Sequence, residues 1–115
     1  MNKKGLLQQS VVVTPLLDEL ELTASVDNRV ERLSPQEYEL FSQLLRYPEQ
    51  SMKRYSLKDV CCDDASSLSD RRLDTMMRAL ISKANVLCPE FPVLRFVEPD
   101  SYVYTEQPPR KPKED

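Results

Sequence analysis

The chain of 115 residues contains no histidine and only one glycine, Gly5. Histidine is the side chain that most often serves as a general base or a metal ligand, so its absence removes the usual centre of both kinds of site. A single glycine cannot supply the glycine-rich loops that cradle phosphate groups. Asp63 and Asp64 are neighbours in a serine-rich stretch, which favours solvated loop acids over a catalytic or metal-binding pair. We therefore expect no enzyme activity, no metal and no cofactor.

Long apolar runs and disulfide-forming cysteine patterns are missing as well. No run approaches the roughly 18 apolar residues of a membrane span, and Gln8 and Gln9 interrupt a start that would make a poor secretion signal. Cys61, Cys62 and Cys88 are an odd number, and two of them are neighbours, which does not suit an ordinary structural bridge. We expect reduced, partly buried thiols in a cytoplasmic protein without a membrane segment.

The charge balance is acidic, with 16 Lys and Arg against 19 Asp and Glu, a net charge of −3 and a pI of about 5.1. This total counts against simple binding to nucleic acid, for which a basic domain is expected. The distribution of charge matters more than the total, and the bases are clustered. They gather at Lys53, Arg54 and Lys58, and again at Arg71, Arg72, Arg78 and Lys83.

The segment 33–50 indicates a short helix with a signal at each end. Ser34 is a typical N-cap residue, Pro35 suits the first turn, and Glu37 completes a capping-box pattern. Pro48 stops the helix. The apolar residues between these signals recur at helical spacing: Tyr38, Leu40, Phe41, Leu44 and Leu45. The pattern predicts a helix over 35–47.

Two further helices are predicted after the first. Ser56, with Asp59 three residues later, repeats the capping pattern and predicts a short helix over 57–62. A longer helix is predicted over 70–87, before Pro89. Its apolar stripe consists of Leu73, Met76, Met77, Leu80, Ile81, Ala84 and Leu87.

Strands are predicted on both sides of the helices. They span 10–15, 20–26 and 29–33 in a small antiparallel sheet, and 93–97 and 102–105 in a C-terminal hairpin. The proline- and charge-rich segment 106–115 is expected to be a disordered tail, and 1–10 a flexible start. Residues 11–105 then form one domain.

This order of elements is that of an α+β winged helix-turn-helix with an N-terminal antiparallel sheet, three helices and a C-terminal hairpin as the wing. The motifs resemble those of the OmpR/PhoB-type winged-helix DNA-binding domain of response regulators. The resemblance rests on four segments in the family's order: LSPQEYELFSQLLRYPEQ for the first helix, SLKDV for the second, RRLDTMMRALISKA for the recognition helix and LRFVEPDSYVY for the wing. It covers about residues 12–105 and includes no receiver domain.

The resemblance implies a small bacterial transcriptional regulator that reads the major groove of double-stranded DNA with helix 70–87. Two departures from the family pattern concern DNA affinity. Ala79 and Ile81 stand where the family often has arginines, and Glu98-Pro99-Asp100-Ser101 replaces the Arg-Gly-x-Gly of the wing. Because phosphate contacts supply much of the affinity for DNA, an acidic wing tip should weaken or redirect binding.

The candidate DNA contacts come from the third helix and from the start of the second. Arg71, Thr75, Arg78 and Ser82 share one face of the third helix. Their spacing alone favours an ordinary solvated face, whereas the resemblance favours contacts with base edges. The other candidates are Arg72, Lys83, Lys53, Arg54 and Lys58. The last three suit DNA-backbone contacts, RNA polymerase contacts or a plain solvated cluster.

The alternative is a lapsed winged helix that binds a protein and modulates another regulator. An acidic wing and a negative net charge fit this alternative. A continuous positive band would favour DNA, and an exposed apolar patch would favour a protein partner. Candidate partners besides DNA are RNA polymerase, another regulator and a second copy of the chain.

Overall fold

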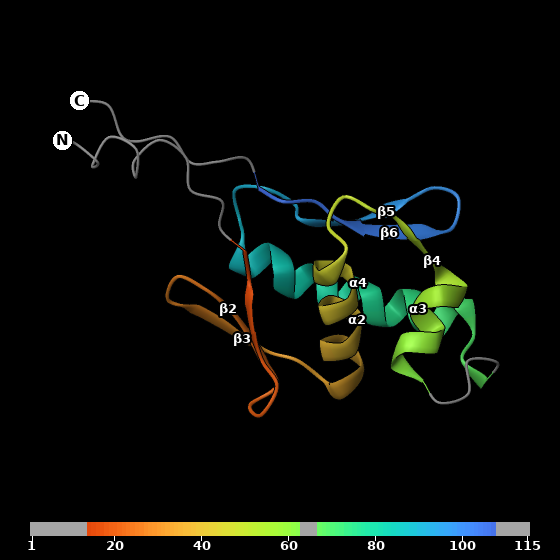
Figure 1. Ribbon diagram of the computed structural model, residues 1–115, viewed down its shortest axis with the longest axis horizontal. Helices are drawn as coiled ribbons and strands as arrows, with labels where there is room; N and C mark the ends of the chain where they lie inside the picture. The colour runs from red at the N-terminus through yellow and green to blue at the C-terminus, as the bar shows by residue number, and fades with distance from the viewer. Residues whose placement is uncertain (1–13, 63–66, 108–115) are drawn as a thin grey trace.

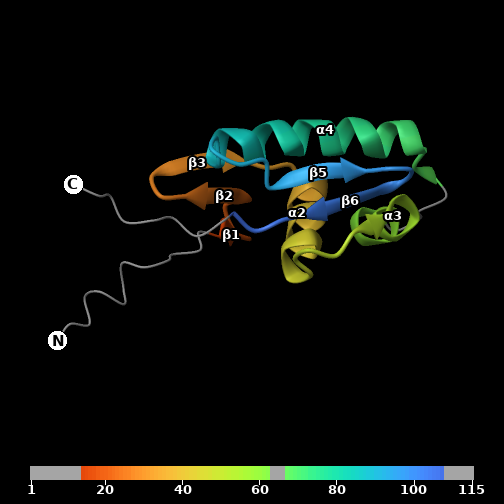
Figure 2. The ribbon, with the colours of Figure 1, turned by 90° about the horizontal axis from the view of Figure 1, so that it is seen from above.

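The computed structural model describes residues 14–62 and 67–107, which form two three-stranded antiparallel sheets and three α-helices (Figures 1 and 2). The first sheet contains, in spatial order, β1 (Leu16–Asp18), β2 (Thr23–Val26) and β3 (Arg29–Arg32). The second contains β4 (Met52–Lys53), β6 (Ser101–Tyr104) and β5 (Leu94–Val97). The helices are α2 (Pro35–Arg46), α3 (Arg54–Cys61) and α4 (Asp70–Leu87).

The N-terminal antiparallel sheet is confirmed, but its first strand, β1, lies after the predicted segment 10–15 rather than within it, and its second strand starts later than predicted. Thr14 and Pro15 precede β1, and residues 10–13 of the predicted first strand lie outside the described residues. The second strand starts at Thr23 rather than at residue 20, because the side chain of Asp18 organises a turn first. Its Oδ1 accepts hydrogen bonds from the N–H groups of Leu20 at 3.0 Å and Glu21 at 3.1 Å.

Helix α2 forms as predicted and ends one residue earlier, at Arg46. The Ser34 side chain accepts a hydrogen bond from the Glu37 N–H at 3.1 Å, and Glu37 Oε1 accepts one from the Ser34 N–H at 2.8 Å. This reciprocal capping box satisfies two backbone donors at the start of the helix. The apolar face is fully buried at Leu40 and Phe41.

Helix α3 starts at Arg54, three residues before the predicted start, so the prediction of a Ser56 cap was wrong. Lys53 is the N-cap and makes no side-chain capping bond. The reason is tertiary. Met52 and Lys53 form strand β4, which pairs with β6, and the Arg54 N–H donates to the carbonyl of Asp100 in the wing turn at 3.0 Å. The chain therefore enters the helix directly from a sheet.

Helix α4 occupies the predicted 70–87 and lies beside both β3 and the C-terminal hairpin (Figure 2). Ser69 caps it by accepting a hydrogen bond from the Arg72 N–H at 3.1 Å. Five residues of its apolar stripe are buried: Leu73, Met77, Leu80, Ala84 and Leu87. Together with Phe41 of α2 and Tyr104 of β6 they belong to one core that joins the helices to the second sheet.

The C-terminal hairpin is confirmed, with Leu94 opposite Tyr104 and Phe96 opposite Tyr102. The predicted disordered tail starts too early. Glu106 donates its N–H to a Glu49 carboxylate oxygen at 3.0 Å, and Gln107 is buried, whereas 108–115 lie outside the described residues. No helix in the described part of the chain has the length and apolar character needed to cross a membrane.

Candidate nucleic-acid interface

The outward face of α4 carries the polar residues that the sequence placed there. Arg71, Thr75, Arg78 and Ser82 are all exposed, and Arg72 beside them is exposed as well. The Thr75 hydroxyl donates its hydrogen to the carbonyl of Arg71 at 3.0 Å, so its oxygen keeps both lone pairs to accept hydrogen bonds. Within residues 14–62 and 67–107, no hydrogen bond or ion pair holds the guanidinium of Arg71, Arg72 or Arg78.

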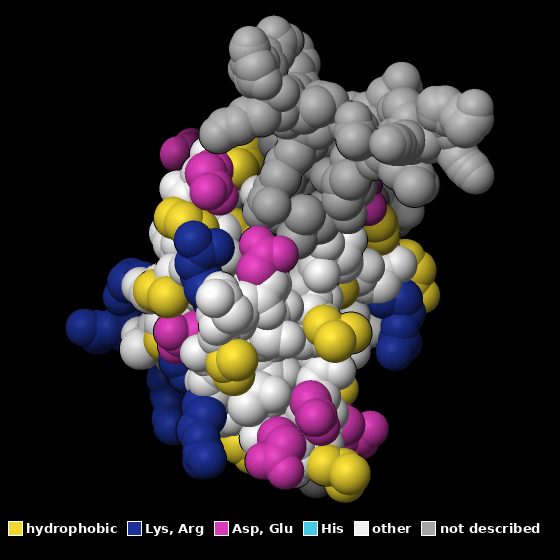
Figure 3. Space-filling model, turned by 90° about the vertical axis from the view of Figure 1, so that its left-hand side faces the viewer, with side chains coloured by type: hydrophobic (Ala, Val, Ile, Leu, Met, Phe, Trp, Pro, Cys, Tyr) yellow, Lys and Arg dark blue, Asp and Glu magenta, His cyan; other side chains and the backbone are white. Residues whose placement is uncertain are grey.

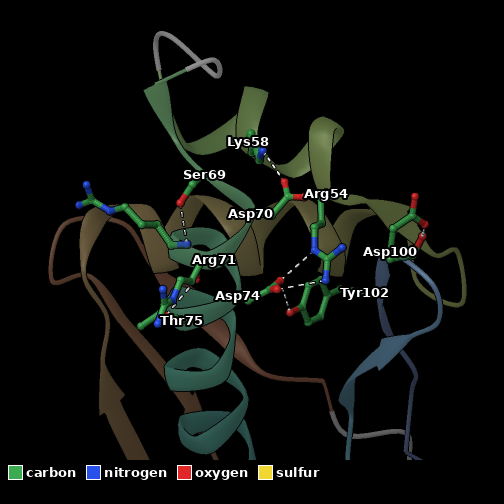
Figure 4. A network of polar contacts seen from close by, with 11 residues as sticks. Arg54, Lys58, Ser69, Asp70, Arg71, Asp74, Thr75, Asp100 and Tyr102 are labelled. Carbon is green, nitrogen blue, oxygen red and sulfur yellow. Dashed lines mark hydrogen bonds and ion pairs between the residues drawn. The ribbon is translucent and has the colours of Figure 1, made fainter.

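Arg54, by contrast, is held inside the domain by Asp74 of α4 (Figure 4). Its Nε and Nη2 atoms donate to the two carboxylate oxygens of Asp74, each at 3.0 Å, in a bidentate ion pair. The Tyr102 hydroxyl of β6 donates to the same carboxylate at 2.8 Å. One carboxylate, in the second turn of α4, thus joins that helix to the start of α3 and to the hairpin.

This cluster shifts the pKa of each member. Burial raises the pKa of Asp74, but the hydrogen bonds from Arg54 and Tyr102 outweigh burial and hold that pKa below its ordinary value. The hydrogen bond to Asp74 raises the pKa of Arg54. Burial, and next the hydrogen bond to Asp74, raises the pKa of Tyr102. At neutral pH the cluster is therefore an ionised carboxylate between a guanidinium and a neutral phenol.

A cavity of about 270 Å³ opens between α4 and the hairpin at this cluster. Phe96 of β5 stands on one side, 5.3 Å below the Arg54 guanidinium carbon and in edge-to-face contact with Tyr102 at 5.2 Å. Arg78 and Ile81 of α4 stand on the other side. Arg54 is therefore held by an anion and an aromatic ring, whereas Arg78 at the same cavity makes no hydrogen bond or ion pair among the described residues.

Two more of the predicted contact residues, Lys58 and Lys83, are also engaged within the domain. Lys58 forms an ion pair with Asp70 at the start of α4. Lys83 donates to Glu37 Oε1 and to the carbonyl of Arg32, both at 2.7 Å. These contacts give both lysines a structural role, whereas Lys53 is exposed at the edge strand β4.

The wing turn presents its acids beside this region. Glu98 is exposed, and Asp100 is half-buried and accepts a hydrogen bond from the Ser101 hydroxyl at 3.1 Å. In Figure 4 Asp100 lies to one side of the Arg54–Asp74 pair. Figure 3 shows the end of the molecule that carries the β2–β3 hairpin, where most of the visible Lys and Arg side chains lie along one edge and Asp and Glu side chains lie both beside them and elsewhere on this face.

Sequence reasoning missed the roles of Asp74 and Phe96. A usable signal existed for Asp74, because it follows Leu73 directly and so stands at the border of the buried stripe of α4. A carboxylate at such a border needs a nearby base or donor. No sequence signal identifies Arg54 as that base, because the contact joins residues twenty positions apart.

Comparisons with known proteins agree with this architecture. The sequence gives no match to models of protein families or to curated proteins. Among solved structures, it is similar to the C-terminal domain of the nisin resistance regulator NsrR, a lantibiotic response regulator, with 24% identity and a TM-score of 0.67 over 79% of this chain and 91% of that one. It is also similar to the DNA-binding domain of the response regulator AdeR, solved in complex with an intercistronic region, with 20% identity and a TM-score of 0.67 over 79% of this chain and 92% of that one.

This chain has the winged-helix fold of those response-regulator domains. The OmpR/PhoB-type fold predicted from the order of the motifs is thereby confirmed. Within this winged helix, α3 and α4 form the helix-turn-helix and the β5–β6 hairpin forms the wing. The Asp74 carboxylate therefore fixes the wing against both helices of the helix-turn-helix.

Proposed function

We propose that this winged helix binds double-stranded DNA and regulates transcription, with the exposed face of α4 in the major groove. The observation that carries the proposal is the set of exposed arginines Arg71, Arg72 and Arg78 on that helix, whose guanidinium groups make no hydrogen bond or ion pair with the described residues. An α-helix fits the major groove, and arginine is the commonest side chain that contacts guanine there. The AdeR domain, which shares the fold, was solved with an intercistronic region, and this supports DNA as the class of partner.

The ion pairs within the domain narrow the set of residues that we propose as direct DNA contacts. Arg71 and Arg78 are seven residues apart, or roughly 10 Å along the helix, so both can follow one groove. We assign base-edge contacts to Arg71, Thr75, Arg78 and Ser82, and phosphate contacts to Arg72 and Lys53. Arg54, Lys58 and Lys83 act indirectly, because their ion pairs hold α3, α4 and α2 in place.

A protein partner is the second candidate, and two surface features favour it. Glu98 places a negative charge at the tip of the wing, where DNA phosphates would be repelled. Leu16, Leu20 and Val30 of the N-terminal sheet and its first turn are exposed, at 71%, 94% and 61%. Exposed apolar side chains of this kind are typical of protein interaction sites when they are contiguous.

The test is the affinity of the parent and of Arg78→Ala for randomised duplex DNA at two salt concentrations. We expect the parent to bind, and Arg78→Ala to lose about 1–3 kcal/mol of binding free energy for the sequences that the parent selects. Arg46→Ala is the matched control, because it removes the same charge from the exposed end of α2. Absence of binding by the parent at low salt, or equal losses in both variants, would refute the proposal and favour the protein partner.

A further inference from the structure

An exposed arginine of the N-terminal sheet lies beside α4, outside the helix-turn-helix. Arg32 is the last residue of β3, and its carbonyl accepts a hydrogen bond from Lys83 Nζ of α4 at 2.7 Å. A lysine side chain bridges the two elements, so the end of β3 lies within one side-chain length of the helix, and Figure 2 shows the two side by side. None of the contacts proposed above uses Arg32.

The side chain of Arg32 belongs to the outer face of the first sheet. Residues that pair directly across antiparallel strands share a face, so Arg32 shares one with Thr23, and also with Val30 two positions earlier. Ala24 and Val26, on the other face, are buried in the core. Arg32 is exposed, and within residues 14–62 and 67–107 no hydrogen bond or ion pair engages its guanidinium.

The dimensions of the major groove place a phosphate backbone at this position when α4 is docked there. A helix with its side chains is about 10–12 Å across, which nearly fills a groove about 12 Å wide. An element that flanks such a helix therefore meets the phosphates at the rim of the groove. We propose that Arg32 of β3 contacts the DNA backbone and extends the interface from α4 onto the N-terminal sheet. This inference rests on the proposed function.

The charges near the two ends of α4 favour a contact on this side. Near the start of α4, the wing turn carries the exposed acid Glu98 (Figure 2). Toward the end of α4, β3 brings Arg32, and the neighbouring Glu31 is half-buried on the opposite face of the sheet. Lys83 cannot replace Arg32, because its ammonium is already bound to Glu37 and to the carbonyl of Arg32. A phosphate therefore meets an acid beside the wing and an arginine beside β3.

A backbone contact has a signature that differs from that of a base contact. Phosphate contacts position a protein on the duplex but do not read its sequence. Loss of Arg32 should therefore weaken binding to every duplex alike and reduce the number of counterions released on binding. Loss of Arg78 should weaken binding mainly for the sequences that the parent selects.

The experiment compares the full chain, Arg32→Gln and Arg29→Gln by fluorescence anisotropy, on a selected and a scrambled duplex at several salt concentrations. Arg32→Gln should lose affinity severalfold on both duplexes, and its plot of log affinity against log salt should be shallower by about 0.9, or one phosphate. Arg29→Gln is the matched control and should keep the slope of the parent. It removes the same charge from the other end of β3, where residue 29 pairs with the buried Val26.

Addition of Arg78→Ala to the series separates this inference from the proposed function. A parent that does not bind overturns both. If the parent binds and Arg78→Ala weakens it, but Arg32→Gln keeps the affinity and slope of the parent, only the contact of Arg32 is overturned. Equal losses in Arg32→Gln and Arg29→Gln would also overturn that contact, because net charge alone would explain them.

Ethylation interference locates the contact on the DNA. Ethylation neutralises single phosphates, and it should weaken binding of the parent at each phosphate that the protein contacts. At least one of these positions should lose its effect in Arg32→Gln, because the partner of that phosphate is gone. An interference pattern identical to that of the parent would overturn the proposal. Thermal melts should coincide for the two proteins, since the Arg32 side chain is exposed.

Discussion

At the scale of single residues, Asp74 determines which of two neighbouring arginines, Arg54 or Arg78, is held within the domain. Its carboxylate accepts three hydrogen bonds, two from Arg54 and one from Tyr102. Arg78 lies near enough to contribute to the lowered pKa of Asp74, yet its guanidinium makes no hydrogen bond to that carboxylate. A single acid on α4 therefore immobilises one arginine and leaves the other exposed for binding.

The first prediction concerns the pH dependence of stability at Asp74. Its folded pKa lies below the ordinary value of 3.8, so its contribution is present above that pH and is lost as the pH falls through the folded pKa. Urea unfolding of the parent should show a falling free energy between about pH 5 and pH 3, and Asp74→Asn should show a smaller fall over that interval. Glu90→Gln, a change at an exposed acid, should keep the slope of the parent. Parallel curves for the parent and Asp74→Asn would contradict this account.

At the scale of elements, α2 and α4 are joined by an apolar contact and by a polar one. Phe41 and Leu80 are both fully buried in the shared core. Beside that core, the buried Glu37 accepts a hydrogen bond from the Ser34 N–H and another from Lys83 of α4. The residue that caps α2 therefore also anchors α4, which couples the start of one helix to the position of the other.

The core contact predicts the effect of Leu80→Ala. The truncation removes a buried side chain and leaves a cavity, so the free energy of unfolding should fall by about 2–5 kcal/mol. Phe41→Ala should lose a similar amount. Ser82→Ala, an exposed change on the same helix, should stay within about 0.5 kcal/mol of the parent. Chemical denaturation measures all three variants, and an unfolding midpoint for Leu80→Ala equal to that of the parent would refute the assigned helix phase.

The capping box of α2 predicts the effect of Ser34→Ala. This change removes the acceptor for the Glu37 N–H at the start of α2 and should cost about 1 kcal/mol of unfolding free energy. Ser34→Asp should recover most of that loss, because aspartate is an equally good N-cap. If thermal melts of Ser34→Ala and Ser34→Asp coincide, the cap does not contribute to stability as described.

At the scale of the whole molecule, the proposed binding to DNA joins an anionic partner to a chain that carries a net charge of −3. The clustering of exposed arginines on α4 makes a negative net charge compatible with DNA binding. The wing tip is the main exception, since Glu98 brings a negative charge close to the helix-turn-helix. We expect the wing to limit affinity rather than supply it.

The last prediction reverses that charge. Glu98→Arg should raise the affinity for duplex DNA, because attraction to a phosphate replaces repulsion, and the salt dependence of binding should become steeper. Glu90→Arg makes the same change of charge beyond the opposite end of α4 and should have a much smaller effect. Fluorescence anisotropy at several salt concentrations distinguishes the two variants. Equal gains in both would show that only the net charge of the protein matters.

The sequence by itself determined the positions of most helices and strands. Ser34 and Ser69 start their helices through hydrogen bonds to residues three positions away, and the apolar stripe of α4 follows the helical repeat. Such signals are local, so they act wherever the rest of the chain lies. The exposed arginines of α4 could be predicted for the same reason, because they occupy the face opposite the stripe.

Only the tertiary structure decided which bases are available and where α3 begins. Arg54 meets Asp74 across twenty residues, Tyr102 meets Asp74 across twenty-eight, and Lys83 meets Glu37 across forty-six. The start of α3 depends on Asp100 in the wing turn, because the carbonyl of Asp100 accepts a hydrogen bond from the backbone N–H of Arg54. Hydrogen bonds and ion pairs of this kind depend on which elements pack together, and no periodicity within a short segment encodes that packing.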